Sequence, residues 1–250
     1  MKDRYHRSPR TIRKHFDQYD PVTGEFRIIK KPINLILDAT FFKRGEGVLV
    51  ARADGRNLFW MNIETEKVDN YQELLEVLLN AEYTFQSFVI DGCSGVRQLL
   101  ERRFPFIPIQ FCQFHQIKII TRYLTTRPKL EASKQLKKIV GELTTTSKSR
   151  FLRKLSKWYR RWDNFLRERT INPETDRKRY KHRRLRSAYF SLQRNLPYLF
   201  TYRKYLYLKI PNTTNSCEGS FSHWKPKVKI HRGISPKRKR KMIDYLLENS

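Results

Sequence analysis

Residues 33–42 read INLILDATFF, and this stretch decides the fold. It is rich in Ile, Leu and Phe, which is typical of a core β-strand, yet it contains Asp38. An isolated carboxylate in an apolar segment is costly unless it is paired with a cation or bound to a metal. Asp38 is therefore the first candidate functional residue, and an ion pair with a neighbouring Lys or Arg is the structural alternative.

Two further acids complete a possible metal site. Asp91 ends the apolar run SFVID, and Glu218 lies far downstream in NSCE. If the strands of Asp38 and Asp91 are adjacent and parallel, the two carboxylates lie side by side and call for a cation. Mg²⁺ suits such oxygen ligands, and two ions could activate an attacking oxygen and stabilise a leaving one. The alternatives are an ordinary turn at Asp91-Gly92 and a capping box formed by Asn215 and Glu218.

The pattern from Pro32 onwards predicts a mixed sheet, because a hairpin is followed by alternating helices and strands. Asp54-Gly55 is a strong hairpin signal. The expected strands are 33–41, about 47–53, about 56–63, 86–91 and 106–111, and the expected helices in this part are 71–79 and 95–103.

Residues 116–210 are expected to be entirely helical. The clearest helix is 147–169, whose apolar stripe includes Trp158 and Trp162. These tryptophans are expected in the core, with base stacking as the alternative. A break is expected at Asn172-Pro173, followed by a helix over about 183–196.

The charge distribution favours nucleic acid as the partner. The net charge is +29, from 53 Lys and Arg against 24 Asp and Glu. Residues 116–210 alone carry 27 basic against 6 acidic side chains, whereas residues 32–115 are slightly acidic. Solvated basic helix faces are the alternative. The residues expected to contact DNA are Arg177, Lys178, Arg179, Lys181, Arg183 and Arg184, together with Lys225, Lys229 and Arg232 after the third acid.

The termini and composition narrow the class further. No apolar run reaches about 18 residues, and the N-terminus has no apolar signal stretch, so neither a membrane span nor secretion is expected. Three cysteines give no disulfide framework, which favours a reducing compartment. Ser8-Pro9 predicts a short basic helix, either a remnant of a helix-turn-helix or a plain basic arm. Lys237–Lys241 is expected to be a DNA-contacting tail, with a nuclear-localisation-like cluster as the alternative.

The order of these motifs resembles the RNase H-like catalytic core of Mutator-like and related bacterial insertion-sequence transposases. Those proteins share an Asp-Gly followed by an amphipathic helix, a Cys-x-x-His after the next strand, and an Asn-x-x-Glu helix after an all-helical insertion. The matching residues here are Asp91-Gly92, Cys112 with His115, and Asn215 with Glu218. The segment KVKIHRGIS also resembles the basic segment that follows the glutamate in that family, and the resemblance spans roughly 32–235.

The resemblance implies a DDE transposase in which Asp38, Asp91 and Glu218 hold two Mg²⁺ ions, for which Mn²⁺ can substitute. Cys112, His115 and Asn215 would support that site, although Cys112 and His115 could also be half of a zinc site. The reaction would be hydrolysis at the ends of an element, followed by attack of the 3′-hydroxyl on target DNA. Double-stranded DNA and a second copy of the chain would be the partners, with no membrane. A cytoplasmic, nucleoid-associated location would follow in a prokaryote.

The expected organisation is an N-terminal arm (1–31), a catalytic core (32–115 and 211–235), a basic all-α insertion (116–210) and a basic tail (236–250). The core would hold a mixed five-stranded sheet, with the insertion before the last catalytic helix. Only about 31 residues precede the core, so an N-terminally shortened copy is expected. The rivals are an RNase H-like nuclease without strand transfer, an inactive transposase-derived DNA-binding protein, and an RNA-binding basic protein.

Overall fold

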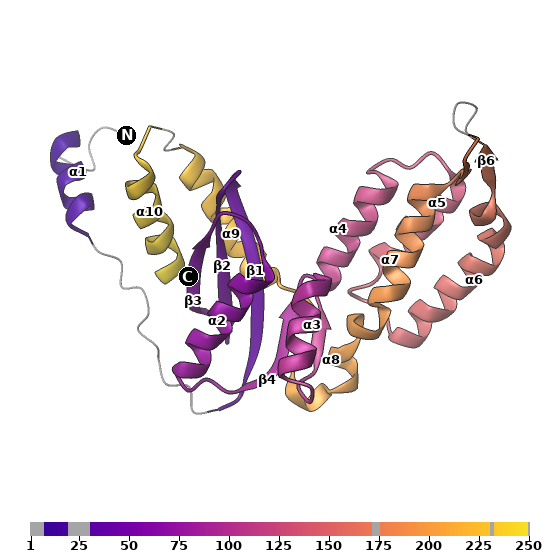
Figure 1. Ribbon diagram of the computed structural model, residues 1–250, viewed down its shortest axis with the longest axis horizontal. Helices are drawn as coiled ribbons and strands as arrows, with labels where there is room; N and C mark the ends of the chain where they lie inside the picture. Colours follow the sequence, from indigo (N-terminus) through magenta and orange to yellow (C-terminus); the bar gives the residue numbers. More distant parts are fainter. Residues whose placement is uncertain (1–7, 20–30, 172–175, 231–232, 250) are drawn as a thin grey trace. The chain divides into compact units, whose positions relative to one another are not determined.

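The computed structural model describes residues 8–19, 31–171, 176–230 and 233–249. Its strands form a five-stranded sheet in the order β3-β2-β1-β4-β5, with antiparallel and parallel pairs, and helices accompany it (Figure 1). The predicted α/β class with a mixed five-stranded sheet is therefore confirmed. The chain divides into two compact units, which are residues 1–85 with 215–250 and residues 86–214.

The first unit is built on an antiparallel meander. It consists of β1 (Ile33–Lys43), β2 (Glu46–Ala53) and β3 (Arg56–Ile63). The predicted β2–β3 hairpin is confirmed, since Asp54 and Gly55 have φ values of 48° and 78°, the positive values that such a two-residue turn requires.

The β1–β2 hairpin contains an irregularity that matters for the surface above it. Phe41 is paired with Gly47 and Lys43 with Glu46, so Phe42 is left over as the extra residue of a β-bulge. A Cβ atom on Gly47 would lie 2.6 Å from the ring of Phe41, so this position requires a glycine. A bulge commonly redirects a side chain, and here Phe42 lines a surface groove.

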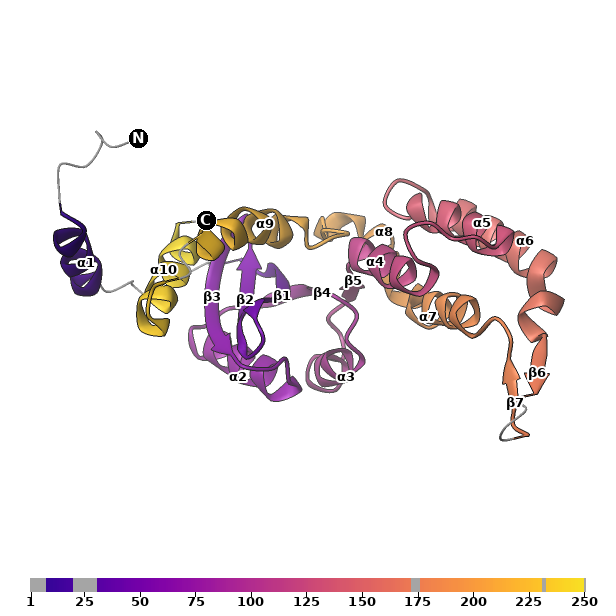
Figure 2. The ribbon, with the colours of Figure 1, turned by 90° about the horizontal axis from the view of Figure 1, so that it is seen from above.

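Three helices cover the two faces of this meander. The helix α2 (Val68–Asn80) packs on one face, and α9 (Asn215–Ile230) and α10 (Pro236–Glu248) pack on the other (Figure 2). The helix α9 begins at Asn215, as the sequence predicts. It buries Cys217, Phe221, Trp224 and Val228, whose spacing of four, three and four residues places them on one face.

Polar contacts hold α10 against β3. The indole Nε1 of Trp60 donates to Oδ1 of Asp244 at 2.9 Å, and Nδ2 of Asn57 donates to the carbonyl of Leu247 at 2.8 Å. Burial raises the pKa of Asp244, and the hydrogen bond from Trp60 opposes that shift. A buried carboxylate therefore joins the C-terminal helix to the sheet.

The predicted N-terminal helix is confirmed as α1 (Pro9–Gln18), with proline in its first turn and Ser8 as its N-cap. The hydroxyl of Ser8 accepts from the backbone N–H of Thr11 at 3.2 Å. Asp17 on α1 accepts two hydrogen bonds from the Arg238 guanidinium, at 2.7 and 2.6 Å. The two ends of the described chain are thus joined by one bidentate ion pair.

The second unit combines a short parallel strand pair with helices. The strand β4 (Phe85–Ile90) pairs with β5 (Ile109–Phe111), and the strand expected over 106–111 is shorter than predicted because Pro108 has no N–H to donate. The helices α4 to α7 run side by side (Figure 1). The helices and the 3₁₀ turn are α3 (Ser94–Arg103), α4 (Gln113–Leu124), α5 (Glu131–Gly141), α6 (Lys148–Arg167), α7 (Arg183–Leu199), α8 (Thr201–Lys204) and η1 (Leu206–Leu208).

The expectation that residues 116–210 are all helical is wrong in one place. The short strands β6 (Arg169–Ile171) and β7 (Lys178–Tyr180) form a two-stranded antiparallel ribbon between α6 and α7. The predicted break at Asn172-Pro173 lies outside the described residues. The helix α7 also continues past its expected end, with Pro197 inside its last turn.

The core of the helical part agrees with its apolar stripe. Trp158 is 3% exposed and donates from Nε1 to the carbonyl of Ala132 at 2.9 Å, while Trp162 donates to Oε1 of Gln135 at 3.0 Å. Trp158 therefore lies in the core, as expected, whereas Trp162 is only half-buried. The predicted division into arm, core, insertion and tail stays a prediction. Across the described residues, no helix combines the length and apolarity needed to cross a membrane.

Candidate functional site

Asp38 lies in the middle of β1 and is 4% exposed. It faces Val50 of β2 in the antiparallel register, and Val50 is completely buried. The consecutive residues Leu35, Ile36, Leu37 and Asp38 are all buried, so both faces of this strand are covered. The burial expected for Asp38 is therefore confirmed, and its role as a metal ligand stays a prediction.

Glu218 lies on α9, which packs against β1. The second half of the same helix carries Lys225 and Lys229, both exposed. Asn215 is the first residue of the helix and is also exposed. The backbone that carries the third predicted acid is therefore next to the strand that carries the first.

Asp91 belongs to the second unit and follows β4 directly. Its Oδ1 accepts from the backbone N–H of Cys93 at 3.0 Å, and Gly92 has a φ of 97°, so the segment forms a turn before α3. The turn that was the structural alternative for this aspartate is present. A carboxylate at the end of a strand remains able to bind a ligand, because Oδ2 is not needed for the turn.

The convergence of the three acids stays a prediction, since Asp38 and the Glu218 backbone belong to one unit and Asp91 to the other. Among the described side chains, no three from His, Cys, Asp and Glu lie close enough together to hold a metal ion. The side chain of Glu218 is not among those described. Asp38 nevertheless fits a hard cation in two respects, because it supplies oxygen ligands and is largely removed from water.

Cys112 has a clear structural role in the second unit. It is completely buried as the N-cap of α4, and its sulfur accepts from the backbone N–H of His115 at 3.5 Å. The backbone N–H and the hydroxyl of Thr214 also donate to this sulfur, at 3.2 and 3.4 Å. Burial raises the pKa of the thiol, while the hydrogen bond from the Thr214 side chain opposes that rise. Cys112 therefore joins α4 to the segment that leads into α9, and its expected role in supporting an active site stays a prediction.

Three glutamines that the sequence analysis did not select are buried near Cys112 in the chain, and two of them, Gln110 and Gln113, form an amide network. Gln110, Gln113 and Gln116 are 0%, 0% and 2% exposed. The side-chain amides of Gln110 and Gln113 both donate to the carbonyl of Leu199, at 3.1 and 2.7 Å. Their spacing of three residues was the only available signal, and polar side chains at that spacing are more often exposed.

The network also reaches α8 and the segment between η1 and α9. Oε1 of Gln113 accepts from Nδ2 of Asn212 at 2.9 Å, and the backbone N–H of Gln113 donates to the Asn212 carbonyl at 3.0 Å. Oε1 of Gln110 accepts from the backbone N–H of Tyr202 at 2.9 Å. The chain before α9 is therefore held by buried hydrogen bonds, which are stronger in a low-dielectric interior.

The predicted DNA-contacting segment builds a strongly basic cavity on the ribbon. This ribbon cavity has a volume of about 440 Å³ and is lined by Arg169, Arg177, Lys178, Arg179, Tyr180 and Arg183. Among the described residues, no carboxylate forms an ion pair with any of its five cations. A concentration of positive charge of this kind is typical of a polyanion-binding surface.

An aromatic ring keeps two arginines of this region in place. The guanidinium of Arg169 lies 4.6 Å from the ring centroid of Tyr180 and also donates to its hydroxyl at 2.9 Å. The guanidinium of Arg186 lies 4.0 Å from the same centroid. The rigid arrangement reduces the side-chain entropy that would be lost on binding a phosphate.

Two of the predicted contacts are occupied within the protein. The ammonium of Lys181 lies 3.2 Å from the carboxylate of Glu168, and Arg184 donates to the carbonyl of Arg122 at 2.9 Å. The hydrogen bond from Lys181 lowers the pKa of Glu168, with a second contribution from His182. Arg177, Lys178, Arg179 and Arg183 are therefore the stronger candidates. Arg232, after α9, lies outside the described residues.

Comparison with known proteins adds no assignment. No protein-family model matches the chain, and no curated protein matches it with statistical significance.

Proposed function

We propose that this chain is the catalytic region of a DDE transposase, which cleaves DNA strands with Mg²⁺ and transfers the resulting 3′-hydroxyl to target DNA. The observation that carries the proposal is the buried carboxylate of Asp38 on a strand that packs against the helix of Glu218. In this proposal Asp91, at the end of β4, supplies the third carboxylate. The motif order that resembles Mutator-like transposases supports the same assignment.

Each group has a defined task in the proposed reaction. The carboxylates of Asp38, Asp91 and Glu218 would hold two Mg²⁺ ions, which supply an activated oxygen nucleophile and stabilise the leaving oxygen. The cations of the ribbon cavity, together with Lys225 and Lys229 on α9, would bind the phosphodiester backbone. The apolar surroundings of Asp38 would exclude competing water from the carboxylate.

A second candidate function is DNA binding without catalysis. The ribbon cavity favours it, because its five cations need no metal site to bind a phosphate backbone. The two functions differ in what they require of Asp38, since binding alone would survive its replacement.

The test is nicking of supercoiled plasmid in Mg²⁺ or Mn²⁺ by the wild type and by Asp38→Asn and Glu218→Gln. Both variants are expected to lose activity by roughly 100-fold or more, the size expected when a group stabilising transition-state charge is removed. Both should still bind DNA. Asp244→Asn is the matched control, because Asp244 is also a buried acid of the first unit but contacts Trp60.

Unchanged nicking in Glu218→Gln would remove the glutamate from the mechanism. Binding without nicking in every protein, including the wild type, would favour the non-catalytic function. Joining of a duplex with a free 3′-hydroxyl to the plasmid would separate a transposase from a nuclease of the same reaction type.

A further inference from the structure

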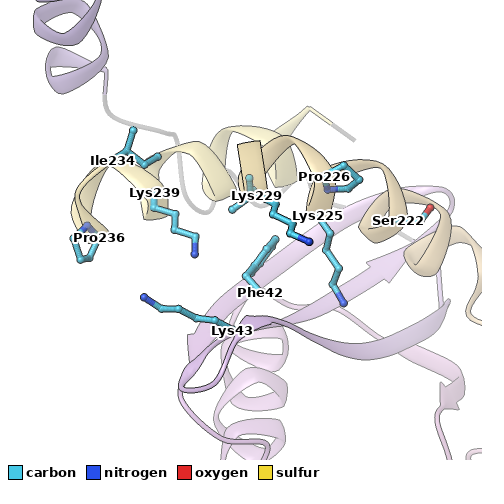
Figure 3. Close-up of a pocket in the computed structure, with 10 residues that line it drawn as sticks. Phe42, Lys43, Ser222, Lys225, Pro226, Lys229, Ile234, Pro236 and Lys239 are labelled. Atoms are coloured by element: carbon cyan, nitrogen blue, oxygen red, sulfur yellow. The ribbon is translucent and has the colours of Figure 1, made fainter. Parts of the chain in front are cut away.

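The first unit has an open groove that presents four ammonium groups. This lysine groove has a volume of about 790 Å³ and lies between the β1–β2 hairpin, α9 and α10 (Figure 3). Its lining is Phe42, Lys43, Ser222, Lys225, Pro226, Val228, Lys229, Ile234, Pro236 and Lys239. Lys225 and Lys229 come from α9, Lys43 from β1 and Lys239 from α10, so separate segments of the chain contribute the charges.

The local backbone explains why these side chains meet. Lys225 and Lys229 are four residues apart and therefore lie on the same side of α9. Figure 3 shows both side chains directed toward the hairpin, with the ring of Phe42 beneath them. The β-bulge at Phe42 provides this apolar floor, against which the lysine methylenes can pack while their ammonium groups stay in water.

Two lysines of the groove share a carboxylate, that of Glu46. Oε2 of Glu46 lies 3.1 Å from the ammonium of Lys43 and 2.8 Å from that of Lys239. Burial raises the pKa of Glu46, but hydrogen bonds from Lys239 and Lys43 outweigh that effect and hold the pKa below its ordinary value. Within the described part of the chain, no carboxylate pairs with Lys225 or Lys229. The groove therefore keeps an excess of positive charge even with Glu46 ionised.

We propose that the lysine groove binds the phosphodiester backbone of a DNA strand, and that Glu46 competes with the DNA phosphates for Lys43 and Lys239. This inference deepens the proposed function, because it identifies a second place where the nucleic acid is held. A phosphate accepts hydrogen bonds from ammonium groups that approach from different directions, which is the arrangement here. The ring of Phe42 and the prolines also give the groove an apolar lining, against which a deoxyribose could pack.

The Glu46 contact gives the proposal a prediction whose size exceeds the effect of net charge alone. Removing a surface acid normally changes affinity for DNA only through net charge. Here Glu46→Gln also releases two lysines that point into one groove, so binding should tighten and depend more steeply on salt. Loss of any groove lysine should have the opposite effect.

The experiment measures fluorescence anisotropy of a short labelled duplex with the full chain in EDTA, over a series of salt concentrations. Lys43→Gln, Lys225→Gln and Lys229→Gln are each expected to weaken binding and to flatten the salt dependence by about 0.9 in the log–log slope. Over a fourfold change in salt, one lost phosphate contact corresponds to about a 3.5-fold change in relative affinity. Lys227→Gln is the matched control, since Lys227 is an exposed lysine of the same helix outside the groove.

The outcomes are distinct. If the slope of log affinity against log salt is the same for Lys225→Gln and Lys227→Gln, the groove lysines contribute only general surface charge and the proposal is wrong. Weaker binding by a folded Glu46→Gln protein, checked by its melting temperature, would refute the competition. A site that binds a phosphodiester backbone is expected to release the duplex to inorganic polyphosphate but not to inorganic phosphate. Displacement of the duplex by inorganic phosphate alone would indicate a small-anion site.

This experiment is independent of the proposed catalysis. EDTA prevents strand cleavage, and Asp38→Asn should bind the duplex as the wild type does. If the lysine variants bind DNA as the wild type does and the wild type still nicks plasmid, the groove proposal fails and the proposed function stands. If the wild type does not nick plasmid but the lysine variants bind DNA more weakly, the proposed catalysis fails and the groove stands as the site of a DNA-binding protein.

Discussion

Replacement of Gln113 by leucine tests the buried amide network that holds the segment leading into α9. The side chain of Gln113 is fully buried, donates to the Leu199 carbonyl at 2.7 Å and accepts from Nδ2 of Asn212 at 2.9 Å. Leucine has a similar volume but offers neither a donor nor an acceptor. The perturbation therefore removes hydrogen bonds without creating a large cavity.

The magnitude follows from what each partner retains. The Leu199 carbonyl keeps its hydrogen bond from Gln110 at 3.1 Å, so it stays satisfied. The side-chain amide of Asn212 loses its acceptor. Two lost hydrogen bonds at about 1 kcal/mol each, with one partner left unsatisfied, give roughly 2–3 kcal/mol. For a chain of this length the melting temperature should fall by roughly 4–12 °C.

The assay is calorimetric unfolding, read for the transition of the second unit because two compact units need not unfold together. Hydrogen exchange at the Thr214 amide, which donates to the Cys112 sulfur at 3.2 Å, reports the same segment locally. Gln98→Leu is the control, because Gln98 is exposed on α3, and its effect should stay within about 0.5 kcal/mol. Equal melting temperatures for the two variants would refute the structural role assigned to the network.

Two further predictions concern the first unit. Gly47→Ala should destabilise the chain by about 1–3 kcal/mol, because its Cβ would lie 2.6 Å from the Phe41 ring. The control is Gly141→Ala, whose Cβ would meet no atom within 4 Å and which should be close to neutral. Equal melting temperatures for the two variants would contradict this prediction. Asp244 has a raised pKa, so its protonated form favours the fold below the ordinary value of 3.8 and that contribution is lost as pH rises through the folded-state value. The stability of Asp244→Asn relative to the wild type should therefore increase as pH rises toward neutrality, because Asn still accepts a hydrogen bond from Trp60. If paired thermal melts show that this relative stability increases toward acid pH instead, the reasoning is wrong.

Local sequence signals predicted the regular elements well. The pair Asp54-Gly55 predicted a hairpin because both residues tolerate positive φ, and the structure has that turn. Ser8-Pro9 predicted the start of α1, and a helix was expected to begin near Asn215, where α9 begins. These features depend on residues close together in the chain, so local patterns were sufficient.

The failures share a physical cause. The strands β6 and β7 are short and almost fully exposed, so they show no alternation of apolar and polar residues that would distinguish them from a basic helix. The glutamine network was missed because burial of an amide depends on partners such as Leu199 and Asn212, which are distant in sequence.

Some residues of the candidate sites could be selected from the sequence, and others could be found only in the structure. The sequence selected Asp38 because a carboxylate in an apolar strand is unusual, and the structure shows that it is buried. It also selected Lys225 and Lys229 from their charge and position. It selected Lys239 only as part of the basic stretch Lys237–Lys241, and it did not select Glu46, because no local signal shows that this half-buried acid meets a lysine far along the chain.

By itself, the order of residues determined where strands and helices begin, which segments are basic and which acids are unusual, because propensity, capping and charge act over a few neighbouring positions. Only the tertiary structure decided that Phe42 becomes a bulge, that Glu46 lies between Lys43 and Lys239, and that buried glutamines hold the approach to α9. Those features arise from contacts between segments far apart in the chain, whose energies depend on three-dimensional distance and burial rather than on sequence spacing.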